Sequence, residues 1–234
     1  MKDERKIAGS LALRVAELRV SAPNGLLLLS VEALTVSPGE TVVIKGPSGA
    51  GKSTLLYALA GLLPATGDIC WGDTNIVHLN DRARTAFRRR HMGFVFQDHL
   101  LFEELSAEGN AALAAAYAPK AERVTLKTSA NEHLTQLGLG GHATRGIASF
   151  SGGERQRVAV ARALAGNPAI VLADEPTASL DRPAADRLIE DLVLLAEASG
   201  RTLIAVTHDT HFHARASRVL NVLDGVLQPE APHG

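Results

Sequence analysis

An α/β fold with a mostly parallel, doubly wound sheet is predicted for this chain of 234 residues from three observations. Short apolar segments alternate with helical patterns, as they do in βαβ units. A glycine-rich pattern follows one apolar segment, and two adjacent carboxylates follow another. Residues 98–165 interrupt the alternation with stretches rich in alanine and leucine. We therefore expect an α/β core with a helical lobe inserted into it.

Composition narrows the class of protein. Hydrophobic residues make up 46% of the chain and charged residues 21%, which is the ordinary balance of a protein with a sizeable core. The formal net charge of −1 argues against wholesale nucleic-acid binding, so no nucleic-acid partner is expected. The single cysteine, Cys70, excludes a disulfide framework and predicts a reducing cytosol.

No targeting or membrane segment is predicted. Residues 1–6 are charged and lack the apolar stretch of a secretory signal. No apolar run approaches the ~18 residues needed to cross a bilayer. Work at a membrane would therefore require recruitment by a partner.

The start of the chain is predicted to consist of strands and turns. Residues 1–9 are expected to form a loose tail, and residues 11–20 alternate apolar and polar side chains like a half-buried strand. Residues 22–25 form a turn, and residues 26–36 carry one or two further strands. Residues 38–40 turn the chain into the next strand.

The most informative stretch is an apolar strand, residues 42–44, followed by residues 46–53, which fit G-x-x-x-x-G-K-[ST] at every fixed position. In this pattern backbone N–H groups and a helix N-terminus face phosphate oxygens. Lys52 is expected to reach the β- and γ-phosphates, and the Ser53 hydroxyl to bind Mg²⁺. The strand before the loop and the apolar helical pattern after it disfavour the alternative of a glycine-rich turn that binds nothing. The predicted nucleotide-binding residues are Gly46, Pro47, Ser48, Gly49, Ala50, Gly51, Lys52, Ser53 and Thr54.

Short elements connect this loop to the helical lobe. Residues 67–72 form a strand and turn, and Asn80 or Asp81 caps a helix that ends in three arginines, residues 88–90. The arginines could contact an anionic membrane or partner, but a solvated helix end, where cations are favoured, is the preferred interpretation. Residues 91–97 form a strand that ends in a polar residue.

The lobe and the last part of the core complete the predicted fold. Helices are expected in the lobe over residues 109–117 and 130–137. The core then resumes with a strand at 170–173, a helix at 183–198, a strand at 202–206 and a strand at about 219–223.

A second anion-binding pattern opens the last helix of the lobe. Ser151 supplies a hydroxyl, and Gly152 and Gly153 accompany it at the helix N-terminus. One chain with one nucleotide has no need of two such sites. In a symmetric dimer, however, each copy could close over the triphosphate held by the other. The alternative that Ser151 is only a helix N-cap stays open at this point.

Two adjacent acids, Asp174 and Glu175, follow the apolar strand at residues 170–173. The carboxyl end of such a strand lies at the ligand-binding edge of an open α/β sheet. Asp174 suits the Mg²⁺ shell, and Glu175 could activate a water for attack on the γ-phosphate. His208 follows the strand at residues 202–206 and could hydrogen-bond the γ-phosphate or the water, although a lone histidine is more often structural.

These motifs, in this order, resemble the ATPase subunits of ATP-binding cassette (ABC) transporters over nearly the whole chain. The resemblance implies a P-loop NTPase fold that fills the chain as a single ABC nucleotide-binding domain. Its mostly parallel core and an antiparallel β subdomain are expected over residues 1–97 and 166–234. A helical subdomain that carries the signature motif is expected over residues 98–165.

The resemblance also implies roles for individual residues. The glycine-rich loop is the Walker A loop, Gln97 is the Q-loop glutamine that binds Mg²⁺ and senses the membrane partner, and residues 150–156 are the signature motif. The implied catalytic residues are Lys52, Gln97, Glu175 and His208. The implied metal ligands are Ser53, Gln97 and the Walker B aspartate Asp174. The implied nucleotide contacts outside the Walker A loop are Ser151, Gly152, Gly153, Glu154 and, in the D-loop, Asp181.

The resemblance further implies partners. ABC ATPases work as head-to-tail dimers that hold two ATP molecules between the Walker A loop of one copy and the signature motif of the other. An integral-membrane permease is expected to dock near residues 97–105, which would place the chain on the cytoplasmic face of the cell membrane. Residues 88–101 are similar to the subfamily of lipoprotein-releasing, macrolide-export and cell-division ATPases, which turn hydrolysis of ATP to ADP and phosphate into export, lipoprotein release or mechanical work.

Three features depart from the family pattern. Residues 21–25 contain no aromatic side chain, whereas ABC ATPases usually stack one on adenine in this region. By analogy with other base–aromatic stacks the loss costs ~1–3 kcal/mol, so weaker ATP binding or poorer base selectivity is expected. Phe150 replaces the usual leucine and Glu154 the usual glutamine of the signature motif, and both changes are expected to be tolerated.

The main alternative function is that of a soluble ABC ATPase in a non-transport process such as iron–sulfur cluster assembly. DNA-repair and chromosome-structure ATPases are disfavoured because they insert long coiled coils between Walker A and signature, and here Lys52 and Ser151 are only about 100 positions apart. Ribosomal ABC proteins usually carry two cassettes, and this chain carries one. A nucleotide-gated module without turnover is disfavoured because Glu175 and His208 are both present.

Overall fold

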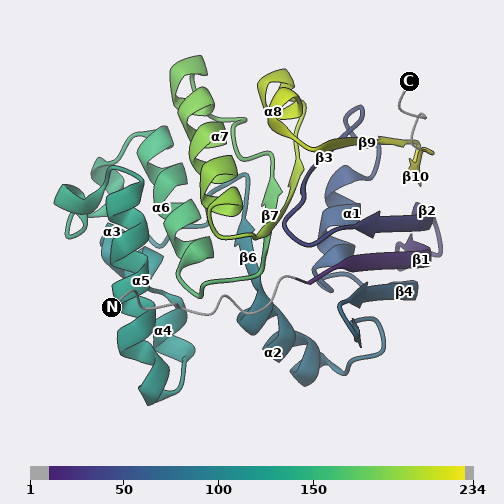
Figure 1. Ribbon diagram of the computed structural model, residues 1–234, viewed down its shortest axis with the longest axis horizontal. Coiled ribbons are helices and arrows are strands. Elements are labelled where there is room, and N and C mark those ends of the chain that lie inside the picture. Colours follow the sequence, from purple (N-terminus) through teal and green to yellow (C-terminus); the bar gives the residue numbers. More distant parts are fainter. Residues whose placement is uncertain (1–10, 230–234) are drawn as a thin grey trace.

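The computed structural model describes residues 11–229, and the tail predicted at residues 1–9 lies outside them. The described residues form one ten-stranded sheet, with a group of helices beyond one of its edges (Figure 1). In spatial order the strands run β5-β4-β1-β2-β10-β9-β3-β8-β7-β6. The strands are β1 (Leu13–Ser21), β2 (Leu27–Val36), β3 (Thr41–Lys45), β4 (Thr66–Trp71), β5 (Thr74–Asn75), β6 (Met92–Val95), β7 (Ile170–Asp174), β8 (Thr202–Val206), β9 (Arg218–Leu223) and β10 (Val226–Leu227). The α-helices are α1 (Lys52–Leu59), α2 (Asp81–His91), α3 (Ala107–Ala111), α4 (Ala114–Tyr117), α5 (Lys120–Gln136), α6 (Gly152–Leu164), α7 (Arg182–Glu197) and α8 (Thr210–Arg215).

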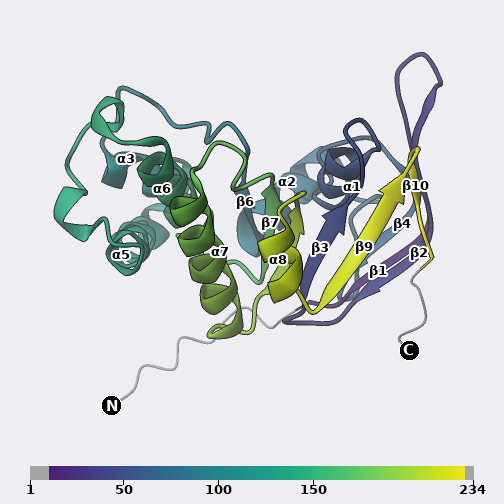
Figure 2. The same cartoon turned by 90° about the horizontal axis from the view of Figure 1, so that it is seen from above.

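One half of the sheet is parallel. Strands β9, β3, β8, β7 and β6 pair in parallel in that order. Strands β7 and β8 are buried along their whole length, which explains why their sequences are continuous apolar runs rather than alternating ones. Helix α1 lies on one face of these strands, and α7 and α8 lie on the other (Figure 2). The predicted doubly wound parallel core is therefore confirmed.

The two faces of the parallel strands belong to two separate hydrophobic clusters, because successive strand residues point to opposite faces. Val42 and Ile44 of β3 share a cluster with Leu55 of α1. Val43, between them, shares a cluster with Leu192 of α7. All five side chains are at most 2% exposed. Helices on both faces thus hold the carboxyl ends of the strands in fixed positions at one edge.

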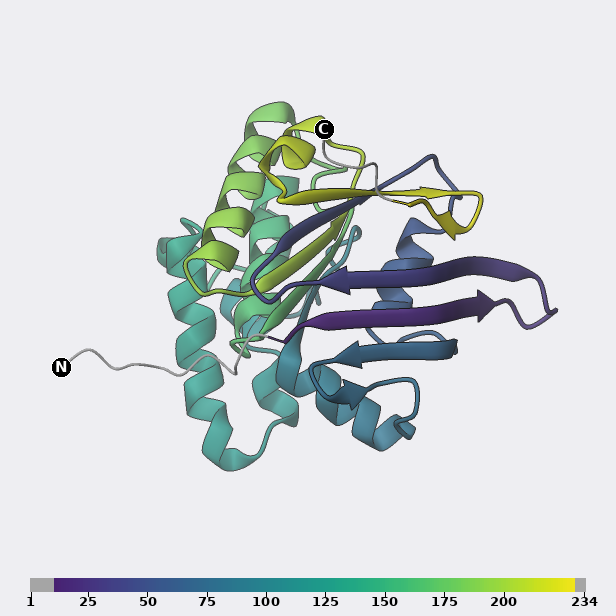
Figure 3. The same ribbon diagram turned by 45° about the vertical axis from the view of Figure 1, so that its right-hand side comes forward.

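The other half of the sheet is antiparallel. Strands β1 and β2 form a long hairpin, and β4 pairs antiparallel with β1. The segment at residues 26–36 holds a single strand, β2. Strand β10, which the sequence patterns do not predict, pairs antiparallel with β9 and pairs with β2 in parallel through Val226 and Ser30. It therefore joins the two halves into one sheet (Figure 3).

The helices between β6 and β7 form the lobe, and they differ in detail from the prediction. The helix predicted at residues 109–117 is two short helices, α3 and α4. Helix α5 begins at Lys120 rather than at residue 130. Its first turns are largely exposed, with Val124 at 74%, so the sequence there carries no apolar periodicity that would reveal a helix.

The boundaries around β6 also need correction. The strand predicted to run from residue 91 to residue 97 covers only Met92–Val95, because His91 still belongs to α2. Gln97 therefore lies in the loop beyond the strand. At the other end of α2, Asn80 is the N-cap, and its side chain accepts a hydrogen bond from the Ala83 amide.

Candidate active site

The glycine-rich loop between β3 and α1 has a backbone shape that requires glycine. Gly46 has a φ of 154°, and a Cβ there would lie 2.1 Å from the carbonyl oxygen of Val222. Gly51, the N-cap of α1, has a φ of 98°. The Nζ of Lys52 donates hydrogen bonds to the carbonyl oxygens of Gly46 and Pro47, both at 2.9 Å. The loop thus curls around the ammonium group at a helix N-terminus, which is the geometry of an anion cradle.

Asp174, at the end of β7, lies against the first turns of α1. Its Oδ1 accepts a hydrogen bond from the Ser53 hydroxyl at 2.9 Å, and its Oδ2 accepts one from the Tyr57 hydroxyl at 2.6 Å. Asp174 is 4% exposed. Burial, the hydrogen bond to Asp174 and the negative charge of that carboxylate raise the pKa of Tyr57 well above its usual range, so the phenol stays a donor.

The donor set around Asp174 fits Mg²⁺ bound together with phosphate. Ser53 and Asp174 supply hard oxygen atoms beside the anion cradle, and Mg²⁺ is usually held by one or two carboxylates plus substrate phosphates. Within residues 11–229 no group of three or more His, Cys, Asp and Glu side chains is placed to hold a metal ion without such help. The chemistry therefore suits a nucleotide-linked cation and not an all-protein metal cage.

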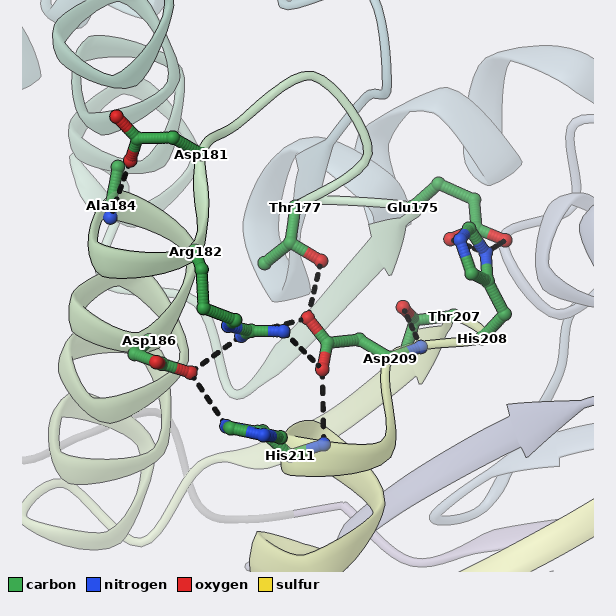
Figure 4. A network of polar contacts seen from close by, with 10 residues as sticks. All are labelled: Glu175, Thr177, Asp181, Arg182, Ala184, Asp186, Thr207, His208, Asp209 and His211. Atoms are coloured by element: carbon green, nitrogen blue, oxygen red, sulfur yellow. Dashed lines mark hydrogen bonds and ion pairs between the residues drawn. The ribbon is translucent and has the colours of Figure 1, made fainter.

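Glu175 and His208 face each other across the ends of β7 and β8 (Figure 4). The Nδ1 of His208 lies 3.1 Å from Glu175 Oε1, and the two side chains are 76% and 15% exposed. Glu175 has a φ of 43°, an unusual backbone conformation for a residue other than glycine, and its amide donates to the Val206 carbonyl oxygen at 2.8 Å. A partly buried carboxylate oriented by an exposed imidazole can accept a proton from a water.

A polar network links the start of α7 to the residue that follows His208 (Figure 4). Arg182 donates to Asp209 Oδ1 at 3.1 Å and to Asp186, and the Nδ1 of His211 lies 2.8 Å from Asp186. The Thr177 hydroxyl donates to the other oxygen of Asp209. Burial opposes the ionisation of Asp209, but these hydrogen bonds outweigh it and lower the pKa of Asp209. The loop that carries His208 is therefore tied to α7.

The signature stretch opens α6 as a complete capping box. The Ser151 hydroxyl accepts from the Glu154 amide at 3.3 Å, and the Glu154 carboxylate accepts from the Ser151 amide at 2.8 Å. The Ser151 N–H is the main cause that lowers the pKa of Glu154. Ser151 is thus the N-cap of α6, as the alternative interpretation predicts. The N-terminus of α6 is exposed, so it stays available to a ligand. Asp181 in turn caps α7 through the Ala184 amide.

The two anion-binding patterns do not meet within one chain. A hollow of about 370 Å³ beside Ser151, Gly152 and Gly153 is closed by Asp181 and its neighbours in α7, and no residue of the glycine-rich loop lines it. In Figure 1 the loop and α1 lie to the right of β7, whereas α6 lies to its left. Each pattern therefore offers half of an anion site.

Gln97 lies exposed in the loop between β6 and the lobe. Its neighbour Phe96 stacks on Phe94 of β6, with ring centroids 4.3 Å apart. Further along, Arg162 of α6 donates hydrogen bonds to the carbonyl oxygens of His99 and Leu100, both of which have positive φ. The loop is thus held at both ends, while the Gln97 side chain faces outward.

Sequence reasoning missed the residues that support the predicted site. Tyr57 lies four positions after Ser53, and this i,i+4 spacing puts both on one side of α1, where a sequence reader could have noticed it. Arg182 is the first residue of α7 and Asp209 caps α8, and no spacing rule connects them. Arg162 is likewise visible only once α6 is packed against the loop after Gln97.

Comparison with known proteins identifies the family. The sequence description of the family "ABC transporter" matches residues 29–178, more than half of the chain. The chain belongs to the ABC transporter family. This confirms the predicted family, and the matched segment runs from the β1–β2 hairpin through the glycine-rich loop and the signature motif to the acids at the end of β7.

Curated ABC ATPases resemble this one along nearly their whole length. "Uncharacterized ABC transporter ATP-binding protein YbbA" of Escherichia coli K12 is 40% identical over 94% of this chain and 97% of its own. "Lipoprotein-releasing system ATP-binding protein LolD" of Novosphingobium aromaticivorans is 41% identical over 92% of this chain and 98% of its own. LolD of Bordetella pertussis is 42% identical over 89% of this chain and 90% of its own. The predicted subfamily is therefore confirmed.

Solved ABC cassettes share the fold. The ATP-binding cassette MJ0796, solved as a dimer in a post-hydrolysis state bound to ADP and Pi, superposes with a TM-score of 0.83 at 33% identity over 95% of this chain and 99% of its own. The cassette cbiO1 from Clostridium perfringens superposes with a TM-score of 0.83 at 26% identity, over 94% of this chain and 88% of its own. This chain is an ABC transporter ATPase subunit, LolD-like in sequence, that binds and hydrolyses ATP.

The described residues of this ABC ATPase include no helix that is both long enough and apolar enough to cross a membrane.

Proposed function

We propose that two copies of this ABC ATPase close head to tail over two ATP molecules and transmit that closure to a membrane permease. The observation that supports this most is the division of the anion-binding groups into two halves that lie apart within one chain. A second copy would bring the Ser151–Gly153 helix terminus of one chain to the glycine-rich loop of the other. The dimeric MJ0796 cassettes provide a precedent for such pairing.

Within each composite site we assign roles to the predicted residues. Lys52 and the N–H groups of residues 46–54 bind the β- and γ-phosphates of ATP. Mg²⁺, with Ser53, Asp174 and Gln97 as its proposed ligands, would neutralise phosphate charge. Glu175 accepts a proton from the attacking water as the water oxygen forms its bond to the γ-phosphorus and ADP departs. His208 orients the Glu175 carboxylate, with which it is in contact at 3.1 Å.

The remaining assignments concern the lobe and the partners. We propose that residues 98–165 act as a helical subdomain that moves with the signature motif, against a core formed by residues 1–97 and 166–234. The permease would dock at residues 97–105, which adjoin both parts, and would hold the ATPase at the cytoplasmic face of the membrane. The LolD relatives belong to lipoprotein-releasing systems, so a lipid-modified protein is the proposed cargo.

A mixing experiment tests the composite site. Lys52→Ala removes the loop's ammonium, and Ser151→Arg obstructs the signature terminus, so each variant alone should lose ATPase activity and ATP-dependent dimerisation. In mixed dimers one of the two sites combines the intact loop of one variant with the intact signature of the other. Mixing the two purified variants should therefore restore nucleotide trapping and some turnover, measured against each variant alone.

Failure of the mixture to trap nucleotide above the level of the single variants would contradict the head-to-tail arrangement. Co-purification from solubilised membranes tests the transport role separately, because a permease should accompany the Glu175→Gln protein. Recovery of a soluble assembly partner in place of a permease would favour the non-transport alternative.

A further inference from the structure

We propose that Tyr57 is a positioning residue that fixes the metal-binding carboxylate of Asp174. The inference deepens the proposed function and rests on the role of Asp174 as a Mg²⁺ ligand. It concerns a side chain outside every motif recognised in the sequence.

The first support is the division of the Asp174 carboxylate between two donors. The Ser53 hydroxyl donates to Oδ1 at 2.9 Å, and the Tyr57 hydroxyl donates to Oδ2 at 2.6 Å. Both donors stand on α1, one turn apart, while the acceptor stands at the end of β7. A hydrogen bond from a hydroxyl to a carboxylate is shorter and stronger than one between neutral groups. Tyr57 therefore holds Oδ2 and leaves Oδ1, next to Ser53, as the atom that faces the cation site.

The second support is that the phenol ring is itself held in place. Tyr57 packs on Phe94 with ring centroids 5.7 Å apart and an interplanar angle of 42°. Phe94 in turn stacks on Phe96 at 4.3 Å. The rings form a row from α1 across β6 to the residue just before Gln97. Because the ring direction is set by this row, the hydroxyl points at Asp174 without further loss of rotamer freedom.

The third support comes from chemistry. A phenol is a hydrogen-bond donor at neutral pH, so the Tyr57 hydroxyl can hold Asp174 Oδ2 while the carboxylate stays available to the metal. Groups that orient a metal ligand from behind commonly change metal affinity by about 10–100-fold when removed. If Tyr57 were merely structural, removal of its hydroxyl would lower the stability of the protein but would leave the Mg²⁺ concentration required for ATP binding unchanged.

The test compares Tyr57→Phe with Tyr117→Phe. The chain has two tyrosines, and Tyr117 is 79% exposed in the lobe, so its hydroxyl provides a matched control. Both substitutions are placed in the full-length Glu175→Gln protein, which is expected to bind ATP without consuming it. The readouts are the Mg²⁺ concentration for half-maximal ATP binding, the affinity for Mn²⁺ measured by electron paramagnetic resonance with ATP present, and ATP affinity in EDTA.

Tyr57→Phe is expected to raise the required Mg²⁺ concentration and to weaken Mn²⁺ binding by about tenfold, with ATP affinity in EDTA unchanged. Tyr117→Phe is expected to change none of these. Equal Mg²⁺ and Mn²⁺ behaviour of the two variants would overturn the proposal. Asp174→Asn distinguishes failure of the Tyr57 proposal from failure of the metal assignment on which it rests. If Asp174→Asn also leaves the required Mg²⁺ concentration unchanged, Asp174 is not a metal ligand and the assignment in the proposed function fails. If Asp174→Asn changes the required Mg²⁺ concentration and Tyr57→Phe does not, only the role of Tyr57 is rejected.

A second measurement does not depend on how well Tyr57→Phe folds. In Tyr117→Phe protein produced with 3-fluorotyrosine, the single fluorine label reports on Tyr57. Its ¹⁹F resonance is expected to shift when Mg²⁺ is added to the ATP-bound protein. A resonance that is the same with Mg²⁺ and with EDTA would show that the phenol does not sense the metal site, and would also overturn the proposal.

Discussion

Leu26, Leu27 and Leu28 are 62%, 52% and 37% exposed near the tip of the β1–β2 hairpin. The tip adjoins the glycine-rich loop, because the carbonyl oxygen of Leu28 lies 3.1 Å from the point that a Cβ on Gly51 would occupy. A nucleotide base that leaves the loop in this direction would meet aliphatic side chains and no aromatic ring. Aliphatic contact gains dispersion and burial but lacks the stacking energy of an aromatic face.

We therefore expect ATP and GTP to bind with affinities within about tenfold of each other, as measured by equilibrium titration with Mg²⁺ present. Ala22→Tyr, which adds a ring beside the leucines, should tighten ATP binding by about 5–150-fold, the equivalent of ~1–3 kcal/mol. Glu32→Tyr, on an exposed position of β2, serves as the control. Tight and strongly ATP-selective binding by the unaltered protein would contradict this explanation.

At the scale of residues, sequence predicts the groups that belong to contiguous motifs. Lys52, Ser53, Asp174, Glu175 and His208 lie at one edge of the sheet because each ends a strand, lies within two residues of the end of one, or opens the helix after one. The residues that hold these groups in place are harder to predict, since hydrogen bonds such as Tyr57 to Asp174 join positions 117 apart. Their partners are defined only by packing.

At the scale of elements, the link from α7 to the loop of His208 depends on one side chain. Arg182, the first residue of α7, donates to Asp209, which caps α8 and follows His208. We expect Arg182→Met to lower kcat by about tenfold with little change in ATP affinity, because displacement of a catalytic group by 1 Å can cost 10²-fold. Steady-state and single-turnover kinetics measure the effect on kcat separately from the effect on ATP affinity.

The same variant has a pH signature. Arg182 helps to hold the pKa of Asp209 below its ordinary value of 3.8, so the link stabilises the fold above that pH and is lost as the pH falls through the lowered value. Denaturant unfolding should show Arg182→Met as less stable at pH 7, with the difference shrinking below about pH 4. Arg215→Met, at the exposed end of α8, should behave like the parent protein at both pH values. Equal kinetics and stability of the two variants would remove the coupling role.

Element predictions succeed where burial imposes a pattern. The fully buried strands β7 and β8 and helix α7 are predicted within one or two residues. The start of α5 and the short helix α8 are not, because exposed turns and a six-residue helix impose no periodicity. Strand β10 is two residues long and depends on pairing with β2 and β9, so only the assembled sheet reveals it.

At the scale of the whole molecule, Glu175→Gln should separate binding from turnover. The amide keeps the shape of the carboxylate beside His208 but cannot take a proton from water, so hydrolysis should fall by about 10²-fold or more while ATP still binds. The ATP-loaded variant should then persist as a dimer in light scattering, and the nucleotide-free variant should be a monomer. Full activity would exclude Glu175 as the base.

The two anion-binding motifs also show which parts of the molecule are predictable from the sequence of one chain. Two anion-binding motifs, around Lys52 and Ser151, are visible in the sequence, and their separation within the fold is visible only in the structure. The doubly wound core follows from alternation of strands and helices, whereas its continuation into a single mixed sheet depends on long-range pairing between β2 and β10.

The contacts that β9 and the turn after it make with the glycine-rich loop have a consequence for biosynthesis. The amide of Gly225 donates to the Ala50 carbonyl oxygen at 3.0 Å, and the Gly46 backbone packs on Val222. The glycine-rich loop, made early during translation, therefore acquires its walls only after β9 and the turn to β10 have left the ribosome. A nascent or prematurely terminated chain would display the loop without its supports and should not retain ATP. Retention of nucleotide should therefore distinguish finished molecules from incomplete ones.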